Sequence, residues 1–154
     1  MRKIQIPQNA PSRDQTWIDV DRIASVEVSS EESDHPIESA LTIEGKGGWR
    51  AANPGMQRIR VIFDQPQKLR RILLLFEDTE NSRTQEFVLR WSPDIERSFR
   101  EIIRQQWNFS PPDSVRETED YAVELSEVKV LELMIIPDKS GGEVRASLAS
   151  LRLA

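Results

Sequence analysis

The sequence predicts an all-β protein built as an antiparallel β-sandwich, or jelly roll, of about eight short strands. Apolar and polar residues alternate over several short stretches, which is typical of strands with one face on a core. Turn-forming residues separate these stretches, as at 92–94 and 138–142. The chain has 154 residues, 38% of them hydrophobic, which is enough for one domain with a continuous core.

Residues 1–23 are expected to form an extended lead-in that packs on the domain. They mix proline, asparagine and serine with a single tryptophan, Trp17, which is the expected anchor. The domain itself is predicted to span residues 24–154. Its first strand is the alternating segment 24–28, and an acidic loop that ends in Pro36 follows it.

The middle of the chain predicts two strands joined by a turn. Residues 59–63 alternate, and residues 69–76 are nearly continuous in apolar side chains, as expected for a strand covered on both faces. Gln65-Pro66-Gln67 between them is expected to turn the chain. The remaining predicted strands are 87–91, 121–125, 131–135 and 146–153.

One segment, 95–107, is compatible with two structures. Its apolar residues recur at helical spacing, and Ser92-Pro93 is suitably placed to start a helix. The sequence alone leaves open whether this segment is a helix or a strand. The residues that form the two helical faces are Ile95, Phe99, Ile102 and Ile103, opposite Arg97, Arg100 and Arg104.

Composition narrows the classes of function. The net charge of −5 argues against nucleic acid as the main partner, since that binding needs clustered positive charge. The chain has no cysteine and no apolar run of membrane-spanning length, so neither disulfides nor membrane insertion is expected. Without a recognisable secretion leader, a cytoplasmic location is expected. The oligomeric state does not follow from the sequence.

No catalytic motif is present, so we expect a binding protein and not an enzyme. The sequence has no nucleophile motif, no metal-ligand cluster and no phosphate-binding glycine loop. A general base would have to come from carboxylates such as Glu117, Glu119 and Asp120. These three are interpreted as surface charge.

The order of the pieces resembles the discoidin, or coagulation-factor C-type, domains and the related galactose-binding-like carbohydrate-binding modules. Residues 44–51 (EGKGGWRA) resemble the acidic-glycine loop of that family, which leads to a tryptophan. The resemblance spans residues 24–153 and rests on order and spacing, because no single motif is specific. The segments that continue it are 57–63, 66–76, 87–94, 121–136 and 146–153.

The resemblance implies a sugar site in the loops at one end of the sandwich. Such a site needs an aromatic face for the pyranose ring and fixed donors and acceptors for its hydroxyls. Instead of contacting a sugar, Trp49 would pack inside the core, and Trp107 would close a hydrophobic edge. For His35 and the arginines the alternative is a solvated surface position. The candidate ligand-binding residues are His35, Trp49, Arg50, Arg104, Trp107 and Asn108.

The resemblance also raises structural calcium, which many family members hold with backbone carbonyls and an acidic side chain in the closing strand. Here the acidic position is Ser150, and the acidic-glycine loop is short and lacks the usual threonine. We therefore expect no cofactor and no metal.

Two functions stay open at the level of sequence. The first is a non-catalytic carbohydrate-binding module. The second is an intracellular protein-protein interaction domain, because the same fold also serves as an adaptor. The identity of the ligand does not follow from the sequence.

Overall fold

The computed structural model describes residues 1–3, 16–95 and 98–154. Antiparallel strands dominate the described residues, and the helices are short. In chain order the elements are α1 (Val20–Ile23), β1 (Ala24–Val28), α2 (Glu38–Leu41), β2 (Trp49–Pro54), β3 (Gln57–Glu77), β4 (Arg83–Ser92), β5 (Arg100–Phe109), β6 (Arg116–Ile136), β7 (Arg145–Leu148) and β8 (Ser150–Leu153). The predicted all-β class and the strand number are confirmed.

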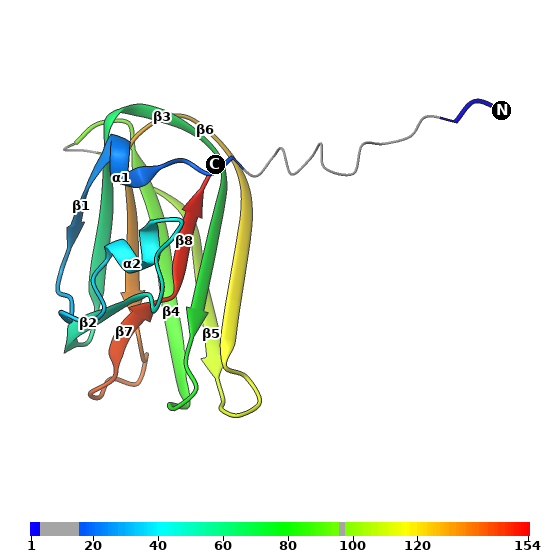
Figure 1. Ribbon diagram of the computed structural model, residues 1–154. Helices are drawn as coiled ribbons and strands as arrows, with labels where there is room; N and C mark the ends of the chain where they lie inside the picture. The colour runs from blue at the N-terminus through cyan, green and yellow to red at the C-terminus, as the bar shows by residue number, and fades with distance from the viewer. Residues whose placement is uncertain (4–15, 96–97) are drawn as a thin grey trace.

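The strands form two facing layers (Figure 1). The larger layer has five strands in the order β1, β3, β6, β4 and β5. The smaller layer consists of β8, the second half of β3 and the first half of β6. The second half of β3 lies in the middle and pairs with both of the others. A separate ribbon of β2 and β7 lies at one end. The architecture is the predicted antiparallel sandwich.

The two longest strands, β3 and β6, belong to both layers. Their pairing shifts register between residues 62 and 71, and such irregularities bend a strand and increase its twist. Figure 1 shows both strands arching over the end of the sandwich near α1. The predicted turn at Gln65-Pro66-Gln67 is therefore wrong: β3 continues through it, and the segment bends between the layers instead of ending one strand.

The ambiguous segment is a strand from Arg100 onward. β5 pairs with β4 over its whole length, from Trp91↔Arg100 to Arg83↔Phe109. The helical spacing was thus overridden by the neighbouring strand, while Glu96 and Arg97 lie outside the described residues. The predicted closing strand 146–153 is divided at Ala149 into β7 and β8, which join different sheets.

The core lies between the layers and consists of alternate residues of the facing strands. Phe76 of the smaller layer and Phe87 of the larger one meet with ring centroids 5.3 Å apart. α1 and α2 pack beside β3 and β8 and help close the sandwich. The anchor predicted in the lead-in, Trp17, is partly buried, and the guanidinium of Arg71 lies 5.1 Å from the centre of its ring. Residues 4–15 of the lead-in lie outside the described residues. No helix of the described chain is long and apolar enough to cross a membrane.

Candidate functional site

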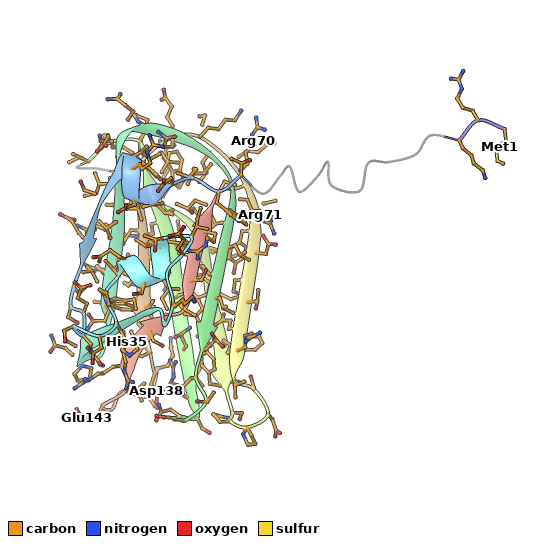
Figure 2. All side chains as sticks on the ribbon, viewed as in Figure 1. Met1, His35, Arg70, Arg71, Asp138 and Glu143 are labelled. Atoms are coloured by element: carbon orange, nitrogen blue, oxygen red, sulfur yellow. The ribbon has the colours of Figure 1, made fainter. Side chains whose placement is uncertain are left out.

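Several loops meet at the end of the sandwich opposite the C-terminus (Figure 1). They connect β3 to β4, β5 to β6 and β6 to β7. In Figure 2, His35, Asp138 and Glu143 lie at this end, whereas Arg70 and Arg71 lie at the other. Side chains at this end are positioned by the strands but are not part of the core, so they are available to bind a ligand.

Arg83, the first residue of β4, holds these loops together. Its Nε donates to Asp78 Oδ2 at 2.6 Å, and its Nη1 donates to the carbonyl of Pro137 at 2.8 Å and to Gln85 Oε1 at 3.1 Å. The guanidinium also lies 4.5 Å from the ring centre of Phe109. Because its side chain is only 1% exposed, these contacts form in a low-dielectric setting and fix the loop backbone.

Beside this anchor lies a hollow of about 180 Å³ between the β3–β4 loop and the β2–β7 ribbon. Arg50 of β2 and Arg145 of β7 line one wall. Both pair with Glu32 Oε1, at 3.1 Å and 3.2 Å, and both keep nearly half of their side chain exposed. Two guanidiniums that share one carboxylate oxygen have further N–H donors that this oxygen does not use.

The opposite wall consists of the loop that follows β3. The lining residues there are Glu77, Asp78, Thr79, Glu80 and Asn81. Burial alone would raise the pKa of Asp78, but hydrogen bonds from the backbone of Glu80, from Arg83 and from the backbone of Asn81 outweigh it, so the pKa lies below its ordinary value. Asp78 therefore keeps its negative charge at neutral pH, but its two oxygens are occupied by these hydrogen bonds. The exposed Glu80 supplies an acceptor opposite the arginine donors.

His35, Trp49 and Arg50 come from neighbouring positions near this end. His35 Nδ1 lies 3.2 Å from the carbonyl oxygen of Gly47, and the backbone N–H of Arg50 donates to the carbonyl of His35 at 3.1 Å. Trp49 is only 1% exposed, and its Nε1 donates to the carbonyl of Ser30 at 3.0 Å. Its ring lies in the core, as the packing alternative states, and offers no face to a ligand.

The other three candidates lie on β5 and do not join the hollow. Asn108 Oδ1 accepts from Thr84 Oγ1 at 2.7 Å, across the β4–β5 pair. Trp107 is half-buried on the inner side of the layer, and its Nε1 has no hydrogen-bond partner among the described residues. Arg104 lies in mid-strand, paired with Glu86 and Glu101, and not in or beside a loop as expected.

The structure thus brings Arg50 together with residues that the sequence did not indicate, chiefly Arg145, Asp78 and Asn81. Asp78 and Asn81 lie in a polar segment between strands, and Arg145 begins β7 after another such segment. A polar segment predicts a loop, but it does not predict which other loop lies beside it. The pairing of β2 with β7 joins positions about a hundred residues apart, and no local pattern carries that information.

The interpretation of Glu117 as surface charge is wrong. Glu117 faces the interior from β6, is 0% exposed, and its Oε1 accepts from Gln85 Nε2 at 3.1 Å. Burial, together with Glu119 nearby, raises its pKa to about 9. Asp120, on the opposite face of the strand, is exposed and pairs with Arg71 at 2.7 Å.

The residues present do not fit the calcium site that the family resemblance raised. Ser150 supplies a hydroxyl where a hard cation would need a carboxylate. In the part of the chain that the structure describes, no group of three or more histidine, aspartate or glutamate side chains is placed to hold a metal ion.

Comparison with solved structures identifies the fold. The chain is similar to the family 32 carbohydrate-binding module of NanJ from C. perfringens, solved in complex with galactose, with 16% identity, a TM-score of 0.64, and 90% of this chain and 97% of that chain covered. It is also similar to the CBM32 of AlyQ in complex with 4,5-unsaturated mannuronic acid, with 16% identity, a TM-score of 0.61, and 86% and 95% covered. A pectin-binding carbohydrate-binding module matches with 18% identity, a TM-score of 0.61, and 85% and 89% covered.

These likenesses show that the chain has the galactose-binding-like, or discoidin-like, β-sandwich fold. The predicted resemblance is confirmed at the level of fold. No family model matches the sequence, and no curated protein matches it.

Proposed function

We propose that the protein is a non-catalytic carbohydrate-binding module whose sugar site is the hollow at the loop end. The observation that carries the proposal is the arrangement of donors from Arg50 and Arg145 opposite acceptors from the exposed Glu80 and from Asn81. Each sugar hydroxyl can both donate and accept a hydrogen bond, so a hollow with donors on one wall and acceptors on the other can bind neighbouring hydroxyls. Solved proteins of the same fold bind galactose and an unsaturated mannuronic acid.

The chemistry of the hollow sets the kind of ligand. None of the described residues that line it is aromatic, so recognition rests on hydrogen bonds rather than on stacking. The volume of about 180 Å³ suits one sugar residue at the end of a glycan. Because Arg83 holds the surrounding loops in place, little conformational entropy is lost on binding. Catalysis is not part of the proposal.

The test is a titration of galactose and galacturonate into the protein and into the double variant R50Q/R145Q. Glutamine keeps a polar side chain, and Glu32 stays partly exposed, so the fold should be retained. Hydrogen bonds to charged groups contribute about 1.5–3 kcal/mol each, so we expect affinity to fall at least about tenfold.

The matched control is R58Q/R104Q, which removes two charges from the outer face of the larger layer. It should bind galactose as the unmodified protein does. Absence of binding of every neutral and acidic monosaccharide by the unmodified protein would overturn the proposal and favour the protein-interaction alternative.

A further inference from the structure

The outer face of the larger layer carries four arginines. Strand pairing places Arg60, Glu132 and Arg90 in one row across β3, β6 and β4. The next row runs from Arg58 through Met134 and Val88 to Arg104. We call this surface, defined by Arg58, Arg60, Arg90 and Arg104, the arginine face.

On the arginine face the cations are exposed, and two of the carboxylates that pair with them, Glu132 and Glu86, are buried, whereas Glu27 and Glu101 are exposed. Glu132 is 0% exposed, and it is bound by Arg60 at 2.7 Å and by Arg90. The side chains of Arg60 and Arg90 remain about one third exposed. Similarly, Glu86 is 8% exposed under Arg104, which is 49% exposed. Solvent therefore meets guanidinium groups on a protein whose net charge is −5.

Two of these guanidiniums contact an aromatic ring of the β4–β5 connection. Arg90 lies 4.5 Å and Arg60 5.7 Å from the ring centre of Phe99. Together with Glu132, this ring limits the rotamers that the two side chains adopt. A ligand that binds them loses less side-chain entropy than it would on free arginines.

A hollow opens at one side of this face. It has a volume of about 210 Å³ and is lined by Glu27, Val28, Ser29, Arg58 and Arg60. Arg58 is exposed and forms no ion pair with any described residue, while Arg60 keeps one guanidinium nitrogen 3.7 Å from Glu27. A carboxylate that enters the hollow meets an arginine fork with unused donors.

The spacing of the arginines favours a repeating ligand over a single anion. Strands lie about 4.7–4.9 Å apart, so the backbones of Arg60 and Arg90, two strands apart, are separated by about 10 Å and those of Arg58 and Arg104 by about 14 Å. The guanidiniums of Arg60 and Arg90 converge on Glu132, while Arg58 and Arg104 lie on either side of them. Among the described residues of the face, Val88 is buried and the ring of Phe99 is partly buried against Arg60 and Arg90, so no fully exposed aromatic anchor is present. Protein interfaces centre on such anchors, so the face is better suited to a charged polymer than to a folded partner.

We propose that the arginine face binds the carboxylates of an acidic polysaccharide, with one uronate in the hollow at Arg58. The inference rests on the proposed carbohydrate-binding function and adds a second, polymer-binding surface to the end-binding hollow. The face would hold the chain of the polymer while the loop end holds a sugar terminus.

The test is calorimetric titration with polygalacturonate at low salt, with neutral dextran as the comparison polymer. The variant R58Q/R104Q removes two guanidiniums and leaves the pairs of Glu132 intact. We expect its affinity for polygalacturonate to fall at least about tenfold. The charge-matched control R22Q/K46Q alters exposed residues elsewhere and should stay within about twofold, and binding should weaken with salt.

Each result separates the two proposals. If R50Q/R145Q loses monosaccharides but keeps polygalacturonate, both stand. If R50Q/R145Q loses polygalacturonate and R58Q/R104Q keeps it, the arginine face is not the site and only the loop-end proposal survives. Equal binding of dextran, or tighter binding of polyglutamate than of polygalacturonate, overturns the acidic polysaccharide as the ligand.

Discussion

Arg83 illustrates how one side chain organises the loop end. It pairs with Asp78, reaches the carbonyl of Pro137 and stacks on Phe109, so three connections depend on it. The pair with Asp78 is almost fully buried, with side chains 1% and 10% exposed. Removing one partner of such a pair leaves an uncompensated buried charge.

The variant R83M should therefore lower the free energy of unfolding by about 3–5 kcal/mol. Chemical denaturation followed by tryptophan fluorescence measures it. R116Q is the matched control, because Arg116 pairs with Glu77 at 3.1 Å on the exposed surface and should cost less than about 1 kcal/mol. Equal losses in the two variants would show that Arg83 is not the anchor.

For single residues, the sequence identified candidate side chains but did not predict whether each one is buried or exposed. Trp49 and Arg50 follow the glycine-rich segment, and that resemblance gave them the same expected role. The alternation of the strand nevertheless sends Trp49 into the core and Arg50 to the surface. Glu117 was misplaced for the opposite reason. A carboxylate in a charged stretch suggests solvent, but position 117 continues the inward register of Tyr121, Val123 and Leu125.

Among the elements, the turn at Gly47-Gly48 shows why a loop needs glycine. Gly48 has φ of +67°, and a Cβ there would lie 2.5 Å from the carbonyl oxygen of Leu148 and 2.9 Å from Ala149 Cα. These atoms are backbone at the point where β7 ends and β8 begins. The close approach sets how the glycine-rich segment enters β2 beside that junction.

The variant G48A should destabilise the fold by about 3 kcal/mol or more, since backbone must shift as well as adopt a left-handed conformation. Gly141 offers a matched control, with φ of +89° and open space around it, so G141A should cost only about 1–2 kcal/mol. The difference in melting temperature between the variants measures the contribution of the contact. Equal melting temperatures would show that the backbone at the β7–β8 junction moves away from the added Cβ at little cost.

The elements also mark the limit of local prediction. β1 was predicted with its observed bounds, because its alternation is bordered by clear breaks. β3 and β6 were each divided in two, since proline and polar residues in mid-segment are typical of turns. What keeps these strands continuous is pairing between residues far apart in sequence, and that information is not local.

At the scale of the whole molecule, the buried carboxyl group of Glu117 links stability to pH. Its pKa is raised to about 9 in the folded protein, against an ordinary value of 4.5. The folded state therefore holds a proton that the unfolded chain releases between these values. Stability from this group is fully present below about pH 4.5 and is lost progressively as the pH rises toward 9.

The variant E117Q should remove this slope and raise the free energy of unfolding at pH 8, because a neutral amide retains the acceptor for Gln85. Urea denaturation at a series of pH values from 5 to 9 measures the effect. E124Q changes an exposed carboxylate of the same strand and should keep the slope of the unmodified protein. A slope that persists in E117Q would assign the titration to another group.

The sharing of β3 and β6 between the layers means that neither layer is a separable piece. A fragment that ends at residue 64 would contain β1 and the first half of β3. It would lack β6, which pairs with β3 in both layers. The scaffold can therefore be inherited or recombined only as a whole. The connections at its loop end, and the outward side chains of its strands, are free to diverge around an architecture that does not change.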